Sequence, residues 1–269
     1  MTTTSSDVLS AAWRSARAAA DDAGVQIRSL HGDHVAVAQE VIRQTWGPSQ
    51  VPQDNLLRAL AHAGSALLGA TRDGEPVGVV MGFLGWTDGL HLHSHMTGVV
   101  GGAKSKGVGF ALKLWQRAEC LSSGIREIRW TYDPLIARNA YFNIVKLGVD
   151  VLAFRPDFYG QMDDIVNAGD SSDRFEVSWQ LDSPRVTEAI AGRRRPVPAD
   201  AQSYPIPRDY DEIRRADPER ALLLRHESRE QFQRLFAADT AVEWDDGGYL
   251  FVPRAAQPPP AVMAGERRG

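Results

Sequence analysis

The sequence predicts an α/β (α+β) chain: a mixed, mostly antiparallel sheet flanked by helices, followed by a C-terminal helical extension. Two observations lead to this class. Apolar residues recur with the strand or the helix period in the order strand, two helices, three strands, helix, strand, helix, two strands. The composition then changes after Asp182, where prolines and arginines become frequent. This order is not the regular alternation of a doubly wound nucleotide-binding fold.

Residues 1–24 are expected to form an N-terminal helix, which Gly24 ends. After it come the first strand and two helices, and then three strands, of which the first two are joined by the hairpin signal Asp73-Gly74. The predicted elements are a strand over 25–30, helices over 33–46 and 53–62, and strands over 66–71, 76–86 and 90–100.

A helix over 110–121 and a strand over 125–132 follow. Asp133-Pro134 then predicts the start of a helix that runs to Leu147 and stops at Gly148. Strands over 149–154 and 174–181 complete the domain that we expect over residues 25–182.

Three further segments are expected after that domain. Residues 183–207 hold five prolines and a run of three arginines, which predicts an extended linker. Residues 208–255 are predicted to be a helical extension, broken near Asp217-Pro218, whose apolar stripe packs on the core. A strand is expected over 249–252, and residues 256–269 are predicted to be a disordered tail.

The composition excludes several classes of protein. The 269 residues carry a formal net charge of −4, and no basic domain indicates a nucleic-acid partner. Cys120 is the single cysteine, which excludes an internal disulfide and a cysteine-based zinc site. The first residues lack the apolar core of a signal peptide, and no apolar run approaches the roughly 20 residues that span a bilayer. We therefore expect a cytoplasmic protein with no membrane partner.

A basic, glycine-rich turn over 99–109 lies between a predicted strand and a predicted helix. The first N–H groups of a helix lack backbone partners, its dipole is positive at that end, and glycines let the backbone approach a phosphate closely. The turn therefore predicts an anion site. The alternative is a plain glycine-rich connection into the helix.

At these residues the chain resembles the GCN5-related N-acyltransferase (GNAT) superfamily. The signature of that family is Arg or Gln, two residues, Gly, one residue, then Gly or Ala; here Lys104 to Gly109 gives this spacing, with Lys in the first position. A second hallmark, a helical Asn followed by Lys-Leu-Gly, matches Asn139 and residues 146–148. The resemblance covers about two-thirds of the chain. The C-terminal addition looks like that of a longer subgroup.

The resemblance implies a mixed sheet that binds acetyl-CoA or another acyl-CoA as co-substrate, with no metal. The loop would hold the pyrophosphate and the end of the preceding strand would pair with the pantetheine arm. The residues implied to bind coenzyme A are Val99, Val100, Lys104, Ser105, Lys106, Gly107, Val108, Gly109, Phe110, Asn139, Asn143 and Lys146.

Three histidines, His91, His93 and His95, alternate along one predicted strand and so share one face, with Leu90, Leu92 and Met96 on the other. His95 lies nearest the cofactor-binding end and is the predicted general base. A His-x-His face also suits zinc, although the sequence offers no further ligand motif. The alternative for His91 and His93 is a partly exposed strand surface.

The family's usual general acid has no counterpart at its expected position, because many members carry a Tyr where this chain has Ile144. Tyr132, Tyr141 and Tyr159 are the candidates for a substitute hydroxyl, and the first two are our assignment. Water is a further candidate donor. The missing Tyr also keeps open a non-catalytic acyl-CoA-binding sensor or interaction module.

The leading hypothesis is an N-acyltransferase that moves an acetyl or succinyl group from coenzyme A to the amine of a small molecule, possibly an amino acid. Without an activated cysteine, direct attack in a ternary complex is preferred to an acyl-enzyme. Arg138, Arg155 and Arg174 are candidates for binding an acceptor carboxylate, and each also fits an ordinary surface position. A homodimer is possible.

Overall fold

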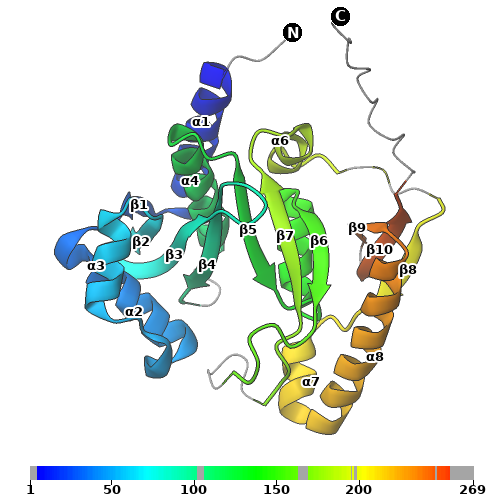
Figure 1. The fold of residues 1–269 in the computed structure, drawn as a ribbon. Coiled ribbons are helices and arrows are strands. Elements are labelled where there is room, and N and C mark those ends of the chain that lie inside the picture. Colours follow the sequence, from blue (N-terminus) through cyan, green and yellow to red (C-terminus); the bar gives the residue numbers. More distant parts are fainter. Residues whose placement is uncertain are drawn as a thin grey trace, which may run out of the picture.

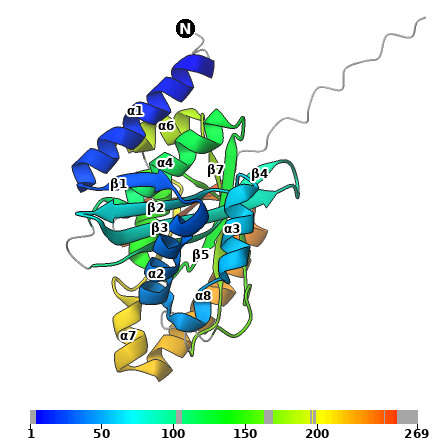
Figure 2. The same cartoon turned by 90° about the vertical axis from the view of Figure 1, so that its left-hand side faces the viewer.

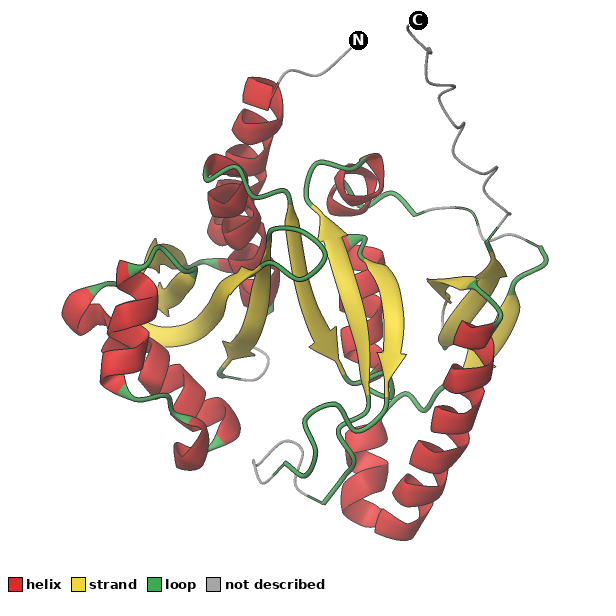
Figure 3. Cartoon of the chain, in the orientation of Figure 1, coloured by secondary structure: helices red, strands yellow, loops and turns green. Residues whose placement is uncertain are grey.

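The computed structural model describes residues 5–101, 106–162, 169–194, 196, 199–245 and 247–254. Its strands form a seven-stranded sheet in the order β1-β2-β3-β4-β5-β7-β6 and a three-stranded sheet in the order β8-β10-β9. All pairs are antiparallel except β4 with β5. The mixed, mostly antiparallel sheet predicted from the sequence is therefore confirmed (Figures 1 and 3).

The first part of the chain follows the predicted order closely. Its elements are α1 (Ser5–Ala23), β1 (Gln26–Ser29), η1 (Gly32–His34), α2 (Val35–Trp46), η2 (Pro48–Gln50), α3 (Asp54–His62), β2 (Leu67–Arg72), β3 (Glu75–Gly85), β4 (His91–Val99) and α4 (Val108–Ser122). The turn between β2 and β3 has Asp73 and Gly74 at positive φ, as a tight two-residue hairpin requires.

The second part of the large sheet starts with β5 (Glu127–Tyr132) and ends with β6 (Asp150–Arg155) and β7 (Arg174–Gln180). The helix predicted over 134–147 begins later, with the short α5 (Ala137–Ala140), because the Asp133 carboxylate caps Leu135 in a turn. It continues as a π-helix, η4 (Tyr141–Leu147), which ends at Gly148 in the left-handed region. A π-helix changes which side chains share a face.

The N-terminal strands are covered by helices on both sides. α1 and α4 pack on one face of β1 to β3, where Val80, Val108 and Leu112 belong to one apolar cluster. α2 and α3 pack on the opposite face, where Leu57, Val79 and Met81 belong to another. Figure 2 shows α1 and α4 on the other side of these strands from α2. α4 is thus buried nearly all round, which explains its many apolar residues.

β4 carries a β-bulge at His95. Met96 pairs with Met81 and Ser94 pairs with Gly82, so His95 is the extra residue between them. The bulge breaks the predicted alternation: Leu92 packs in the cluster that contains α4 residues, whereas Met96 packs with α2 and α3. Met96 is therefore not on the same face as Leu92, and that prediction is corrected.

The C-terminal part has α6 (Pro184–Ile190), β8 (Gln202–Pro205), α7 (Tyr210–Ala216), α8 (Pro218–Ala237), β9 (Thr240–Asp245) and β10 (Gly248–Pro253). The helix break at Asp217-Pro218 lies where the sequence places it. The segment expected to be an extended linker, 183–207, contains α6 and β8, because Ser183 caps α6 and Val186 and Ala189 are buried. The predicted tail, 256–269, lies outside the described residues.

Aromatic rings join the extension to the large sheet. Phe232 of α8 lies 4.8 Å from Phe175 of β7 between ring centroids, and Tyr249 of β10 lies 5.1 Å from the same ring. The small sheet lies next to α8 (Figure 3). The extension therefore shares one apolar core with β5, β6 and β7.

Candidate active site

A polar cleft lies where β4 and β5 part. The two strands are hydrogen-bonded only at Leu92–Ile128 and His93–Arg129 and then separate. The cleft measures about 420 Å³. It is lined by β4, β5, α4, α5, η4, the chain before β7, and α7. A strand edge without a partner strand offers backbone N–H and C=O groups to a ligand.

The start of α4 lies in the region expected to bind a pyrophosphate. Gly107, its N-cap, has φ 90° and no side-chain cap, so the first N–H groups of the helix keep their capacity for an anion. Lys106 beside it is exposed, and Phe110 is half-buried. Val108 is buried in the core, and Gly109 approaches Val99. Lys104 and Ser105 lie outside the described residues.

The floor of the cleft is formed by Lys113 of α4 and Ser94 of β4, both of which are buried. The Lys113 ammonium Nζ donates to Ser94 Oγ at 3.0 Å and to Gln116 Oε1 at 2.8 Å. It also lies 3.9 Å from the centroid of the Trp130 ring. Burial lowers the pKa of Lys113 to about 7.

His95, the predicted base, lines the cleft and is exposed in part. Its ring lies 5.7 Å from Phe83 and 6.1 Å from His93, and partial burial lowers its pKa. His93 also has a lowered pKa, chiefly from burial and then from the neighbouring His95. His91 is buried and contacts the Gly89 carbonyl, away from the cleft.

Two of the three polar residues predicted on the helix after β5 reach the cleft. Asn139 and Asn143 line it, and Asn143 Oδ1 accepts a hydrogen bond from Trp130 Nε1 at 3.1 Å. Lys146 is exposed and does not line it. Just after β4, the N–H of Val100 donates to the Val77 carbonyl at 3.0 Å, so this predicted ligand group is already paired.

The three candidate acids lie in two different pockets of the structure. Tyr132 and Tyr159 line the cleft. Tyr132 is buried, its pKa is raised by burial, and its hydroxyl lies 3.5 Å from that of Tyr249. The Tyr159 hydroxyl lies 3.2 Å from Thr131 Oγ1. Tyr141 lines a different pocket, near Trp244 and Arg208, and carries Arg194 over its ring.

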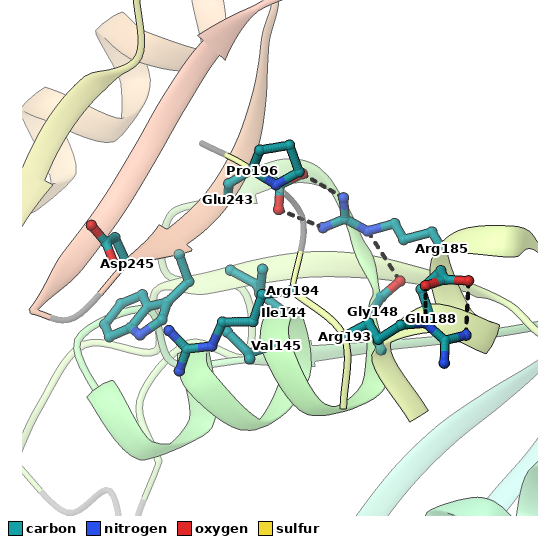
Figure 4. Close-up of a pocket in the computed structure, with 12 residues that line it drawn as sticks. Ile144, Val145, Gly148, Arg185, Glu188, Arg193, Arg194, Pro196, Glu243 and Asp245 are labelled. Atoms are coloured by element: carbon teal, nitrogen blue, oxygen red, sulfur yellow. Dashed lines mark hydrogen bonds and ion pairs between the residues drawn. The ribbon is translucent and has the colours of Figure 1, made fainter. Parts of the chain in front are cut away.

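Ile144 also points away from the cleft. It lines a separate pocket between η4, α6 and β9 (Figure 4). There Arg185 binds Glu243, and Arg193 binds Glu188. Counting back from Gly148 as in the family's helix identifies Ile144, whereas the residues that line the cleft here are Asn139 of α5 and Phe142 and Asn143 of η4.

Charged residues form the wall of the cleft opposite β4. Arg138 of α5 pairs with Asp211 of α7 at 2.7 Å, and Arg214 of α7 binds the same carboxylate at 3.0 Å. Arg174 and Asp133 also line the cleft. Arg155, the other predicted carboxylate ligand, pairs with Glu176 and does not line it. This wall therefore combines cations and carboxylates, and part of it comes from the C-terminal extension.

A buried ion-pair cluster holds that wall in place. Arg225 of α8 is fully buried and binds both oxygens of Asp133, at 2.9 and 2.7 Å, and both oxygens of Asp170, at 2.6 and 3.1 Å. Its guanidinium lies 5.0 Å from the Tyr210 ring centroid. Hydrogen bonding from Arg225 contributes to a lowered pKa for Asp170 despite the burial of that carboxyl. Sequence reasoning missed this cluster because its members lie far apart in the chain.

Sequence reasoning also missed the buried pair formed by Lys113 and Ser94. Lys113 is the one charged residue within 108–115, an otherwise apolar stretch, and this was the available signal. Among the described residues no group of three or more His, Cys, Asp or Glu has a metal-binding arrangement. No helix within the described ranges is long and apolar enough to cross a membrane.

No family model matches the chain, and no curated protein matches it in sequence. Solved structures do. Naa50 from Arabidopsis thaliana, solved with a bisubstrate analogue, is 16% identical, with a TM-score of 0.44 over 58% of this chain and 97% of that one. The ribosomal-protein-S18-alanine N-acetyltransferase from Escherichia coli is 14% identical, with a TM-score of 0.47 over 59% and 95%. Aminoglycoside 6'-acetyltransferase type Ii is 18% identical, with a TM-score of 0.45 over 58% and 97%.

The order of helices and strands from β1 to β7 is the one that the sequence resemblance implies. The described chain has the GNAT-like mixed, mostly antiparallel fold that its sequence predicts. The elements from β1 to β7 form this mixed sheet and its covering helices, and residues 184–254 add the extension.

Proposed function

We propose that this protein is an acyl-CoA-dependent N-acyltransferase that transfers an acetyl or related acyl group to the amine of a small molecule. The observation that carries the proposal is the cleft itself. It extends from the parting of β4 and β5 to a charged wall, and the uncapped start of α4 lies after β4.

The donor half is supported by the residues around β4 and α4. The first N–H groups of α4 and the exposed Lys106 suit a pyrophosphate. The unpaired edge of β4 beyond His93 suits an extended arm that hydrogen-bonds like a strand. Asn139 and Asn143 lie across the cleft and add amide groups for the same arm. These residues fit acyl-coenzyme A, which supplies the activated thioester.

The acceptor half is supported by the charged wall. The half-buried Asp211 suits a cationic amine, whereas Arg138, Arg174 and Arg214 suit an anionic group on the same molecule. A small amine that also carries a carboxylate, such as an amino acid, satisfies both. The wall thus favours a small zwitterionic acceptor.

The chemistry proposed is direct attack of the neutral amine on the thioester carbonyl. This step needs a group that removes the ammonium proton and one that protonates the departing thiolate. His95, predicted from sequence, is one candidate base, because it lines the cleft with a lowered pKa. Tyr159 and Tyr132 are candidate acids, and Tyr159 is the more accessible.

The test combines calorimetry with coenzyme A and a thiol-release assay over a panel of small amines. Gly107→Trp places a bulky side chain at a positive-φ position where even a Cβ meets Ala23 at 3.4 Å, so we expect coenzyme A binding to be lost. Gly64→Trp imposes a similar backbone strain at an open position far from the cleft and is the control.

The possible outcomes separate enzyme from sensor. Coenzyme A binding with turnover of one or more amines supports the transferase. Binding without turnover of any amine favours the alternative from the sequence, a non-catalytic acyl-CoA sensor. If the wild type does not bind coenzyme A and Gly107→Trp makes no difference, both the transferase and the sensor hypotheses are contradicted.

A further inference from the structure

We propose that Lys113, acting through the Ser94 hydroxyl, takes the proton from the acceptor amine. The inference rests on the proposed acyltransferase function and deepens it by assigning the base to a buried pair rather than to His95. Both residues line the floor of the cleft at the point where β4 and β5 separate.

The position of Lys113 is unusual for a lysine. Its side chain is 2% exposed and lies between α4 and the tryptophans of two strands, Trp130 of β5 and Trp179 of β7. Among the residues that the structure describes, no carboxylate lies within ion-pair distance of its Nζ. A lysine in a core without an acid partner is costly, because burial favours its neutral form.

Yet the surroundings accommodate both protonation states. The charged form is stabilised by the Trp130 ring at 3.9 Å and by the Gln116 carbonyl oxygen at 2.8 Å. In the structure the Ser94 hydroxyl donates to Gln116 Oε1 at 3.1 Å. When Lys113 is neutral, this hydroxyl can turn and donate to Nζ across the same 3.0 Å, while Nζ still donates to Gln116. A base needs both states within reach near the working pH.

The titratable groups that face Lys113 do not compete for this role. On its own helix, the Cys120 thiol has a pKa raised by burial to about 12. On β4, His93 is the neighbour whose own pKa Lys113 helps to lower. On β5 and β7, the side chains that face Lys113 are those of Trp130 and Trp179, which are uncharged. Burial accordingly places the pKa of Lys113 at about 7.

The proton balance is complete within the cleft. Ser94 Oγ accepts a proton from the acceptor ammonium and passes its own proton to Lys113 Nζ. The neutral amine then forms a carbon–nitrogen bond as the carbon–sulfur bond breaks, and the second nitrogen proton goes to the thiolate. Lys113 returns its proton to solvent after the products leave.

The kinetic test compares Lys113→Met and Ser94→Ala with His95→Ala. With an acceptor that is charged at neutral pH, we expect the first two to lower kcat/KM about a hundredfold or more. With methoxyamine, which is already neutral, the same variants should stay within about threefold of the wild type, because no proton must be removed first. Arg14→Met, an exposed change on α1, is the control for charge loss.

The pH profile gives a readout that a structural role does not move. The wild type and His95→Ala should show kcat/KM rising with pH through about 7, as Lys113 becomes neutral, and Lys113→Met should lack this limb. If Lys113→Met slows both kinds of amine equally, or if His95→Ala alone removes the limb, the proposal is wrong.

A titration of the side chain tests the pair without turnover. In protein labelled with ¹³C at lysine Cε, the resonance lost in Lys113→Met should titrate near pH 7. A titration near the ordinary lysine value overturns the proposal even if the protein transfers acyl groups. Failure of every amine in the panel, with coenzyme A still bound, instead overturns the transferase function and the base with it.

Discussion

The guanidinium of Arg225 binds both carboxylate oxygens of Asp133, at 2.9 and 2.7 Å, although the two residues are 92 positions apart. Asp133 follows β5 and lines the cleft, and Arg225 lies in the middle of α8. The C-terminal extension is thereby fixed to the loop that starts the acceptor wall. Asp133 also caps Leu135, so the contact orders the turn before α5.

Arg225→Ala should lower the free energy of unfolding by about 3–5 kcal/mol, because the buried carboxylates of Asp133 and Asp170 lose their closest counter-charge. They keep only the more distant arginines Arg174, at 3.9 Å, and Arg214, at 3.7 Å. Urea titration measures this loss. Arg215→Ala is the matched control: Arg215 is exposed, pairs with Glu212 on the helix surface, and should cost less than about 0.5 kcal/mol. Equal losses in the two variants would show that the buried cluster does not stabilise the fold.

Gly148→Ala should destabilise the protein more than Gly160→Ala does. Both glycines have positive φ, 72° and 66°, and an alanine there costs about 1–2 kcal/mol. A Cβ at Gly148 would also lie 2.8 Å from Ala189 Cβ and 2.9 Å from the Arg185 carbonyl oxygen. A Cβ at Gly160 would meet no described atom within 4 Å. The crowding should add about 1–3 kcal/mol, measured by thermal or urea unfolding. A smaller loss at Gly148 would mean that α6 is not packed against η4.

Lys113→Met should stabilise the folded protein and flatten the pH dependence of its stability. Burial lowers the pKa of Lys113 from 10.5 to about 7, so between these values the unfolded chain binds more protons than the folded one. The wild type should therefore gain stability as pH rises from about 7 to 10.5. Unfolding at a series of pH values should show a smaller rise in Lys113→Met. An unchanged slope would contradict the burial of the ammonium.

Arg138→Gln should raise KM for an acceptor that carries a carboxylate and leave the coenzyme A dissociation constant unchanged. Arg138 lines the acceptor side of the cleft, and its guanidinium is paired with Asp211 at 2.7 Å. We expect about a tenfold effect, the size of one charge-assisted hydrogen bond. The same acceptor as its amide is the control and should be unaffected. Equal effects on acid and amide would exclude carboxylate recognition by this residue.

The larger sheet could be predicted from local sequence because its elements carry clear periods and turn signals. The hairpin at Asp73-Gly74 and the helix break at Asp217-Pro218 are examples. The strands β8 and β9 were missed, since each is short and has no strong alternation. The π-helix and the bulge at His95 were also missed, because both result from how neighbouring elements pack rather than from a local pattern.

The candidate site likewise contains some residues that the sequence predicts and others that only the packing reveals. The start of α4 and the two asparagines of α5 and η4, Asn139 and Asn143, follow from motifs with fixed spacing, and their roles as coenzyme A ligands remain predictions. Lys113 appeared as an ordinary lysine on a helix, because only the packing of Trp130 and Trp179 around it reveals its burial. The charged wall depends on α7, and no local pattern indicated that Arg214 would meet the cleft.

Because the C-terminal extension contributes to the cleft, the residues that line the cleft are encoded by distant stretches of the gene. The donor contacts that we propose are encoded around β4, α4, α5 and η4, whereas Asp211 and Arg214 of the proposed acceptor wall are encoded downstream. Because one buried cluster around Arg225 joins the two stretches, we expect substitutions in α7 to alter acceptor choice and to leave the donor half intact. Diversification of such a protein, in nature or by engineering, would need to retain Arg225 and its two aspartates and could vary the rest of that wall freely.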